Sequence, residues 1–316
     1  MALVSVIITT YNGDTRGFLG KAIQSVLKQT FHDIELIIVD DGSLDKTPEV
    51  CREMAGPRVK YIRQANAGVG AARNSGIGAA SGGFICFLDD DDEWAPTKVE
   101  RQLEEFRKGS SRLGLVYTAI ELIDETGNVV GLQRHEVPAD PYKSLFFYNF
   151  VDAPSSVMVR ASVLRQVGKF FNDVFVPAIQ GCEDRDLWIR VAREYEIAAV
   201  PEPLVQYRLP GGRQQMSRNI AQMEQSELTM LALALKSAPP EIAKLSDSAH
   251  ASTLTRIAME YFAAGEYDTF RDRVRKVIRL GGSSRALLVR FALSFSPPAV
   301  RLSRQVARRL APRRTA

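Results

Sequence analysis

The chain has 316 residues, of which 45% are apolar and 25% charged, a composition that indicates a globular protein and excludes a fibrous or disordered one. No apolar run reaches the roughly 18 residues that a membrane-spanning helix needs, so we expect no segment that crosses a bilayer. The net charge of +4 is unevenly distributed: residues 271–316 carry thirteen Arg or Lys and one acid, a net charge of +12, which leaves −8 for residues 1–270.

The three cysteines, Cys51, Cys86 and Cys182, are far apart and include no CxxC pair. This spacing argues against a disulfide framework and a zinc site, and it favours a reducing compartment. The apolar residues 3–9 lack a basic leader and a cleavage site, so we interpret them as a first strand rather than a signal peptide. The expected location is the cytoplasm.

Strands and helices alternate over the first third of the chain. Helical spacing of apolar residues follows the first strand at 18–27, and Thr47 and Pro48 begin a second helix. A third helix follows Gly70 and contains Arg73 and Asn74, and a fourth begins near Pro96. This order predicts a doubly wound, mostly parallel α/β sheet. The predicted strands are residues 3–9, 34–39, 59–63 and 84–88.

Four consecutive aspartates, at 89–92, follow the apolar run 84–88. A run of that kind is typical of a buried parallel strand, whose carboxyl end lies at the ligand-binding edge of an α/β sheet. Carboxylates this close repel one another unless a cation or several donors neutralise them, and a hard divalent metal that carries phosphate oxygens would do so. Asp40 and Asp41, after the second strand, would face the same edge. The alternative is a solvated acidic turn that caps the helix near Pro96.

The glycine-rich residues 66–76 do not have the spacing of a dinucleotide fingerprint, and they follow the third strand rather than the first. We interpret these glycines as helix entry and close packing. Arg73 and Asn74 on this helix are candidates to reach a ligand, and a solvated helix face is the alternative.

Beyond residue 107 the pattern is more mixed. A hairpin is predicted from 113–123 and 129–133, a short strand at 154–160, a helix at 162–167, and strands at 198–200 and 204–208. Residues 183–192 are acidic at their start and amphipathic afterwards, which the helix dipole alone would explain. Arg208 and Arg213 follow the last strand, where a mobile loop could close over a diphosphate; surface solubility is the alternative.

From about residue 219 the pattern is helical, so we predict a domain at 1–218 and a helical region at 219–316. Residues 251–263 and 267–280 resemble one helical hairpin of a tetratricopeptide array. Residues 285–311 mix apolar and arginine residues, which fits either contact with an anionic membrane surface or packing against the acidic body.

Five motifs together resemble the family 2 inverting glycosyltransferases of the GT-A fold. They are Val-Ile-Ile-Thr-Thr-Tyr-Asn at 6–12, Ile-Val-Asp-Asp-Gly-Ser at 38–43, Asn-Ser-Gly at 74–76, Phe-Leu-Asp-Asp-Asp-Asp at 87–92 and Glu-Asp-Arg-Asp-Leu-Trp at 183–188. The resemblance covers residues 3–210 and implies a GT-A sheet flanked by helices, with a helical C-terminal extension. The QxxRW motif of processive members is missing, which implies transfer of one sugar per encounter.

The resemblance also implies roles for individual residues. The acidic run matches the family's DxD motif in the frame 89–91, with Asp90 and Asp92 as an alternative frame, and Asp184 matches the general base. Mn²⁺ or Mg²⁺ is the implied cofactor. The implied site comprises Thr10, Tyr11, Asp40, Arg73, Asp89 and Asp90 for the nucleotide, Asp91 for the metal, Arg208 and Arg213 for the diphosphate, and Glu183 and Trp188 on the acceptor side.

The expected reaction moves a sugar from a nucleotide-diphospho-sugar, UDP being the family's commonest nucleotide, to a hydroxyl of a glycan or lipid-linked acceptor in surface polysaccharide synthesis. One base suffices for inversion by direct attack, whereas retention through a covalent intermediate would need a second carboxylate. A sugar-phosphate nucleotidyltransferase and a non-catalytic nucleotide-binding partner of the same fold are the alternatives. We expect no nucleic-acid partner, and the basic tail leaves peripheral attachment to the inner face of a membrane open.

Overall fold

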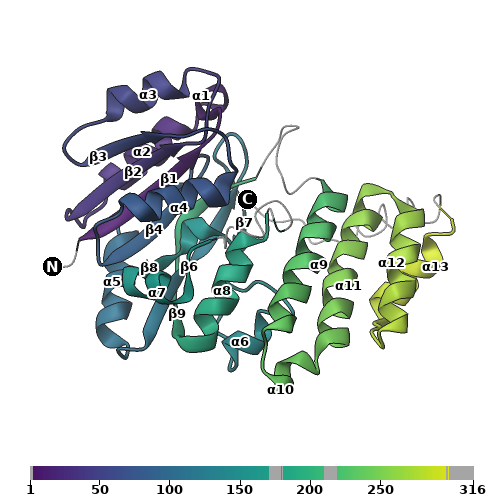
Figure 1. Cartoon of the computed structure of the whole chain (residues 1–316). Coiled ribbons are helices and arrows are strands. Elements are labelled where there is room, and N and C mark those ends of the chain that lie inside the picture. Colours follow the sequence, from purple (N-terminus) through teal and green to yellow (C-terminus); the bar gives the residue numbers. More distant parts are fainter. Residues whose placement is uncertain (1–2, 171–178, 180, 210–218, 297, 299–316) are drawn as a thin grey trace, which may run out of the picture. The chain divides into compact units, whose positions relative to one another are not determined.

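The computed structural model describes residues 3–170, 179, 181–209, 219–296 and 298 (Figure 1). The chain divides into two compact units, Met1–Arg218 and Asn219–Ala316. Each unit has its own hydrophobic core.

A mixed sheet forms the centre of the first unit (Figure 1). Its order in the described residues is β3-β2-β1-β4-β8-β6-β9-β5, and β7 pairs with β6. The first four strands of this order are parallel, as predicted, whereas β8 runs antiparallel to both of its neighbours and β5 runs antiparallel to β9. The strands are β1 (Val4–Thr10), β2 (Ile34–Asp40), β3 (Val59–Arg63), β4 (Phe84–Asp89), β5 (Glu93–Trp94), β6 (Leu113–Ile123), β7 (Val129–Gln133), β8 (Met158–Arg160) and β9 (Glu196–Arg208).

Helices cover both faces of this sheet because the strands in its centre are apolar on both sides. Residues of α2 and α5 share a core with Val6 and Ile8 of β1, while α4 packs against Ile7 on the opposite face. The helices of this unit are α1 (Gly13–Arg16), α2 (Leu19–Leu27), α3 (Thr47–Met54), α4 (Val69–Ala79), α5 (Lys98–Lys108), α6 (Pro141–Ser144), α7 (Ala161–Val167) and α8 (Glu183–Glu194).

Two strand predictions were wrong in detail, and proline explains both. Residues 154–160 were predicted as one strand, but Pro154–Ser156 forms a 3-10 turn, η1, and β8 begins at Met158. Residues 198–200 and 204–208 were predicted as separate strands, but β9 is continuous through two prolines. Its pairing with β6 shifts register around Ala119, opposite Pro203, which accommodates residues that have no N–H to donate.

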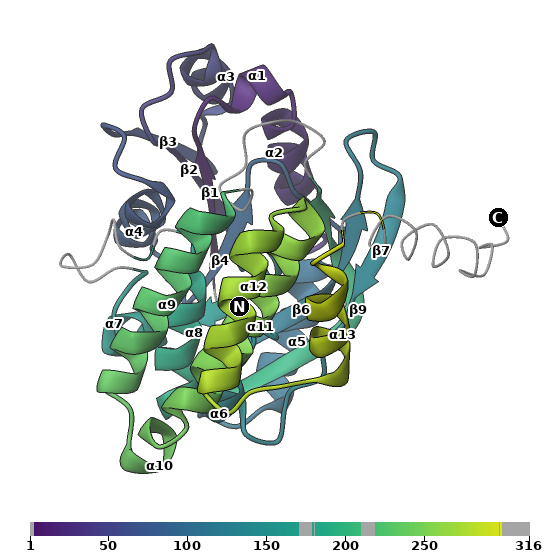
Figure 2. The same ribbon diagram turned by 90° about the vertical axis from the view of Figure 1, so that its right-hand side faces the viewer.

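The second unit is helical, as predicted. In both views α9, α11 and α12 lie side by side (Figure 2). The turn between α11 and α12 contains Gly265, whose φ of 85° suits glycine. The helices are α9 (Ile220–Lys236), α10 (Pro240–Ala243), α11 (Ser246–Ala264), α12 (Tyr267–Arg279) and α13 (Arg285–Leu293). Within the described part of the chain, none is long and apolar enough to span a membrane.

The close packing of α4 on β1 gives a matched pair of substitutions. A Cβ at Gly76 would lie 2.4 Å from Ile7 Cγ2, whereas a Cβ at the exposed Gly78 would meet only Lys169 Nζ, at 3.8 Å. We therefore expect Gly76→Ala to destabilise the first unit by about 1–3 kcal/mol. Gly78→Ala, on the same helix, should be neutral or stabilising by up to about 1 kcal/mol.

Urea unfolding followed by tryptophan fluorescence measures this difference, because the chain's two tryptophans, Trp94 and Trp188, both belong to the first unit. Equal effects of the two substitutions would contradict the packing argument.

Candidate functional site

The carboxyl ends of β1, β2 and β4 meet at one edge of the sheet. The strand register places Thr10 opposite Asp40 and Thr9 opposite Asp89. Because the three strands are parallel neighbours, the two acidic strand exits lie at the same edge, as the sequence predicted.

Two of the four consecutive aspartates are buried and bonded internally. Asp90 Oδ2 accepts a hydrogen bond from Thr10 Oγ1 at 2.5 Å. Asp92 Oδ2 accepts from Ser155 Oγ at 2.6 Å, and Asp92 Oδ1 accepts from the Arg208 backbone N–H at 3.0 Å. Burial, followed by the charges of Asp91 and Asp89, raises the pKa of Asp92 well above its ordinary value. Asp92 therefore binds a proton more readily than an exposed aspartate does, and a cation bound nearby would oppose this rise.

Asp89 and Asp91, in contrast, are partly exposed. This pattern belongs to a turn that follows β4, closed by a hydrogen bond from the Asp92 N–H to Asp89 O at 3.1 Å. It favours the frame 89–91 for ligand contact over the frame 90–92. Among the residues described, no three His, Cys, Asp or Glu side chains are arranged to hold a metal ion. A cation that arrives with a diphosphate needs only one or two carboxylates, and Asp91 with Asp89 fits that requirement.

Arg73 of α4 connects the acidic edge to the start of α8. Its Nη2 donates to Asp89 Oδ1 at 2.7 Å and its Nη1 to Glu183 Oε1 at 3.1 Å. The guanidinium is almost fully buried and lies over the Phe170 ring, 5.2 Å from its centroid. The Phe170 ring in turn packs edge-on against Phe87 of β4 and Trp188 of α8. One side chain thus joins α4, β4 and α8.

Asp184 lies in the first turn of α8, next to this bridge. Burial raises the pKa of its carboxyl to about 7, and the charge of Glu183 adds to the rise, while the Arg185 N–H and Arg73 oppose it. Asp184 as a whole is half-buried. A carboxylate with a pKa near neutrality is suited to accept a proton at physiological pH.

Comparisons with known proteins agree with this architecture. A family model described as "Glycosyl transferase family 2" matches residues 5–168, about half of the chain. The chain belongs to glycosyl transferase family 2. The family resemblance inferred from the five motifs is thereby confirmed.

Individual relatives extend the match. An uncharacterized glycosyltransferase of Methanocaldococcus jannaschii is 29% identical over 68% of this chain and 74% of its own length. An uncharacterized glycosyltransferase of Nostoc is 38% identical over 52% of this chain and 46% of its own. Chondroitin synthase of Escherichia coli is 41% identical over 40% of this chain, but the match spans only 18% of that enzyme.

Solved structures confirm the GT-A fold. TarS residues 1–349 of S. aureus, solved with UDP-GlcNAc, superpose with a TM-score of 0.64 at 18% identity, over 88% of this chain and 81% of that one. The mannosyltransferase PcManGT of Pyrobaculum calidifontis, solved with GDP-Man and Mn²⁺, gives 0.60 at 17% identity, over 97% and 79%. The helical C-terminal region predicted for this family 2 enzyme is likewise confirmed.

Asp40 does not present its carboxylate at the surface. It is wholly buried, accepts from Tyr61 Oη at 2.8 Å and from the Ser43 N–H at 2.8 Å, and pairs with Arg63. Contact between Asp40 and a nucleotide base, which remains a prediction, would require displacement of one of these partners. Tyr11 is 44% exposed and lies next to Thr10 at the end of β1.

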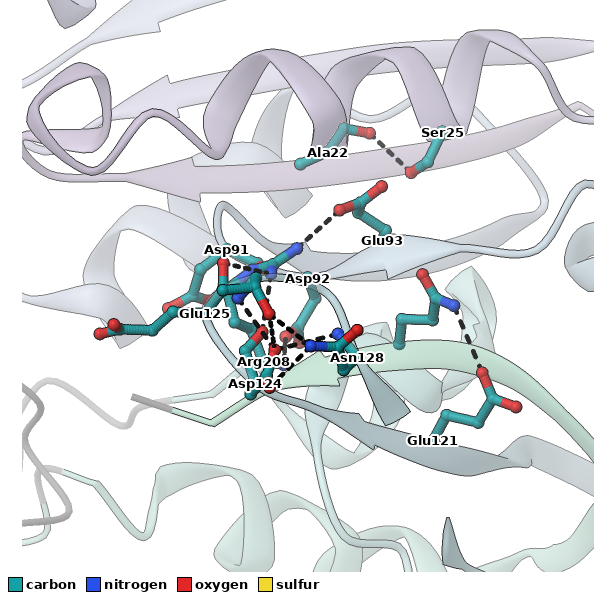
Figure 3. Close-up of polar contacts among 12 residues, drawn as sticks. Ala22, Ser25, Asp91, Asp92, Glu93, Glu121, Asp124, Glu125, Asn128 and Arg208 are labelled. Atoms are coloured by element: carbon teal, nitrogen blue, oxygen red, sulfur yellow. Dashed lines mark hydrogen bonds and ion pairs between the residues drawn. The ribbon is translucent and has the colours of Figure 1, made fainter. Parts of the chain in front are cut away.

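Both interpretations of Arg208, as a residue of a mobile loop and as a surface arginine, were wrong. It is the last residue of β9, almost fully buried, rather than a residue of a mobile loop or an exposed surface. Its guanidinium donates to Glu93 Oε1 and to the backbone carbonyls of Asp91, Asp124 and Glu125, as Figure 3 shows. These bonds hold the acidic turn against β5 and the turn between β6 and β7. Arg213 lies outside the described residues.

The acceptor-side assignments also need correction. Trp188 is fully buried in the core, so it cannot touch an acceptor. Glu183 is almost as deeply buried, with Oε1 on Arg73 and Oε2 accepting from the Gly181 N–H at 2.6 Å. Both assignments followed from a sequence motif. A motif shows which residues are neighbours in sequence, but it does not show which face of the helix each side chain occupies.

Two residues at the site were missed. Ser155, in η1, bonds Asp92 and accepts from the Asp89 N–H. Tyr207, on β9, precedes Arg208, and its pKa is raised by burial and by the carboxylates of Asp92, Asp89 and Asp91. Neither residue belongs to a motif, so no sequence signal marked them.

The Arg73 bridge predicts strong coupling between α4 and α8. Arg73→Met should lower the free energy of unfolding of the first unit by about 3–5 kcal/mol, because it leaves the Glu183 charge buried without its cation. The double substitution Arg73→Met with Glu183→Gln should regain about 0.5–3 kcal/mol of that loss. Urea unfolding monitored by tryptophan fluorescence provides both values. Strictly additive effects of the two single substitutions would rule out the bridge.

Proposed function

We propose that this family 2 enzyme is a non-processive, inverting glycosyltransferase that moves a sugar from a UDP-sugar to a hydroxyl of a glycan or lipid-linked acceptor. The observation that supports the proposal most directly is the convergence of Asp184 and Asp89 around Arg73, with Asp91 two residues further along the acidic turn. The site thereby combines a carboxyl suited to accept a proton with a carboxylate pair suited to hold a metal–diphosphate.

The nucleotide would bind at the edge formed by β1, β2 and β4. The exposed Tyr11 ring offers a surface for a base, and Thr10 and Asp90 bond each other at its inner side. The related structures were solved with UDP-GlcNAc and with GDP-Man, so the nucleotide base is a question for direct measurement.

Asp91, assisted by Asp89, would hold the divalent cation, Mn²⁺ or Mg²⁺. When bound, such a cation neutralises the charge that develops on the departing diphosphate. Arg73 fixes the position of Asp89, while Arg208 and Ser155 fix the backbone of the acidic turn. The chain's own residues therefore pre-organise the donor site, which lowers the reorganisation that transfer requires.

Asp184 would accept the proton of the acceptor hydroxyl as that oxygen attacks the anomeric carbon. The C–O bond to the acceptor forms while the bond to the diphosphate breaks, and configuration inverts. Direct attack requires only this one base on the acceptor side.

The region 219–316 would contribute to acceptor or membrane attachment. Leu288 and Val289 of α13 and Phe295 just after it are exposed, and the segment 271–316 that contains them carries a net charge of +12. Apolar side chains combined with basic ones favour an anionic lipid surface, which would bring the enzyme to a lipid-linked acceptor in surface polysaccharide synthesis.

The elevated pKa of Asp184 predicts the pH dependence of transfer. A carboxyl accepts a proton only when it is ionised, so kcat/KM should rise with pH through about 7 and level off above it. Asp184→Asn should lower kcat by about 10²–10⁴-fold while nucleotide binding persists. Rates measured from pH 5 to 9 test this. A wild-type profile that stays level across this range, or normal turnover by Asp184→Asn, would remove Asp184 from the mechanism.

The metal assignment predicts how donor binding responds to Asp91. Asp91→Ala should weaken Mn²⁺-dependent UDP binding by about 1 kcal/mol or more, because it removes a charged contact. Glu125→Ala is the matched control, since Glu125 is an exposed acid of the neighbouring turn (Figure 3). Calorimetric titration of UDP and of GDP, each with and without Mn²⁺, measures the effect. Unchanged metal-dependent affinity in Asp91→Ala would contradict the assignment.

Analysis of the reaction products separates the two alternative functions. Release of pyrophosphate from a nucleoside triphosphate and a sugar phosphate would indicate a nucleotidyltransferase. Nucleotide binding without donor hydrolysis or transfer would indicate a non-catalytic partner.

A further inference from the structure

The segment 146–154 of the first unit joins two parts of the site, the start of α8 and the acidic turn. Leu145 O accepts from Arg185 Nε at 2.8 Å, next to Asp184, and Ser155 at the other end bonds Asp92. Residues 146–154 therefore begin beside Arg185, the neighbour of Asp184, and end beside the acidic turn. Loops in such positions commonly carry binding residues on a rigid scaffold.

Asp152, within this segment, has an unusual backbone. Its φ is 62°, and it is one of two non-glycine residues with positive φ among those described. Asn149 stabilises the conformation, because its Nδ2 donates to Asp152 O at 2.9 Å and its Oδ1 accepts from the Val151 N–H. Backbone strain of about 1–3 kcal/mol that is held in this way is concentrated at functional sites.

The Asp152 carboxylate pairs with an accessible imidazole. His135 Nε2 lies 3.2 Å from Asp152 Oδ1, and the His135 side chain is 38% exposed. The backbone of His135 is held in place by a hydrogen bond, because its carbonyl accepts from the Oη of the buried Tyr117 at 2.9 Å. The pair therefore has a fixed position and an open side.

An exposed aromatic ring completes the cluster. Tyr148 is 47% exposed, and its ring lies 6.1 Å from that of Phe150, which in turn packs against Tyr117. Burial, followed by the charges of Asp152, Tyr148 and Glu136, raises the pKa of Tyr117 above its ordinary value. The buried rings of Tyr117 and Phe150 support the cluster, in which His135, Tyr148 and Asp152 keep accessible surface.

We propose that His135, Tyr148 and Asp152 bind the acceptor as a saccharide. The inference rests on the proposed transferase function and specifies its acceptor. A sugar ring has an apolar face that packs on a tyrosine ring and a rim of hydroxyls that bond a carboxylate and an imidazole. A phosphate would bring a second negative charge beside the Asp152 carboxylate, so the group that fits this position better is a sugar ring.

The test compares Asp152→Asn and Tyr148→Ala with two matched controls in the full chain. Asparagine tolerates the positive φ of Asp152, so loss of function would not reflect backbone strain. Tyr148→Phe keeps the ring. Asp140→Asn removes a charge from an exposed residue of the same region and keeps its capping bond to the Lys143 N–H. The acceptor probes are the methyl glycosides of glucose, galactose, mannose, N-acetylglucosamine and N-acetylgalactosamine, with the donor selected by calorimetry.

Three quantities are measured: the acceptor KM and kcat, donor hydrolysis without acceptor, and UDP affinity. We expect Asp152→Asn and Tyr148→Ala to raise the acceptor KM by about tenfold or more, with hydrolysis and UDP affinity unchanged. Tyr148→Phe and Asp140→Asn should behave as the wild type does. A purely structural role for the cluster would alter hydrolysis and UDP affinity as well, which would overturn the inference.

Other outcomes separate failure of this inference from failure of the proposed function. An unchanged acceptor KM in both variants, or a wild type that hydrolyses donor but transfers to none of the glycosides, overturns the saccharide site alone. A wild type that neither binds UDP or GDP nor hydrolyses a donor overturns the transferase proposal, and the acceptor site with it.

Discussion

The Arg73 guanidinium, buried between two carboxylates, is the interaction on which the site depends. Asp89 belongs to the end of β4, and Glu183 belongs to the start of α8, more than ninety residues later in the chain. An ion pair at such depth stabilises only when its geometry is good, and removal of one partner leaves an uncompensated charge in a medium of low dielectric. The bridge therefore ties the position of Asp184 to that of the acidic cluster.

The acidic turn places four consecutive aspartates close together in the folded protein. Asp90 and Asp92 accept hydrogen bonds from hydroxyl and backbone donors inside the protein, and Arg208 donates to three carbonyls and to Glu93 around the turn. Asp89 and Asp91 keep an accessible side. The buried pair maintains the shape of the turn, and the accessible pair is available to a ligand. The raised pKa of Asp92 shows the electrostatic cost that remains in the protein, and a bound cation would reduce it.

The family match and the geometry support different parts of the mechanism. The match covers residues 5–168, which include the strands of the donor edge but end before α8. The assignment of Asp184 therefore depends on the motif at 183–188 and on the position of that motif beside Arg73. The acceptor cluster around Asp152 lies inside the matched range, yet its three side chains come from separate parts of the loops after β7 and α6.

Much of the fold was predictable from local pattern. Apolar runs followed by acids identified β1, β2 and β4, and because parallel neighbours end at one edge, the convergence of Asp40 and Asp89 followed from sequence alone. The helical second unit was also evident from spacing. Prolines misled the assignment at 154–160 and 198–208, because a proline is compatible with a strand only where the register shifts, and register is a property of two strands.

The direction of each side chain was decided by the tertiary structure. Arg208, Trp188 and Glu183 have the residue types of ligand-binding groups, but each is turned into the protein by packing partners distant in sequence. The same holds for residues that no motif marked, such as Ser155 and the pair His135 and Asp152. Residue type and spacing determined the fold family and the edge where the site lies, because both depend on local periodicity. Which carboxylates are accessible, and which charges compensate them, depended on contacts between segments that only the folded chain brings together.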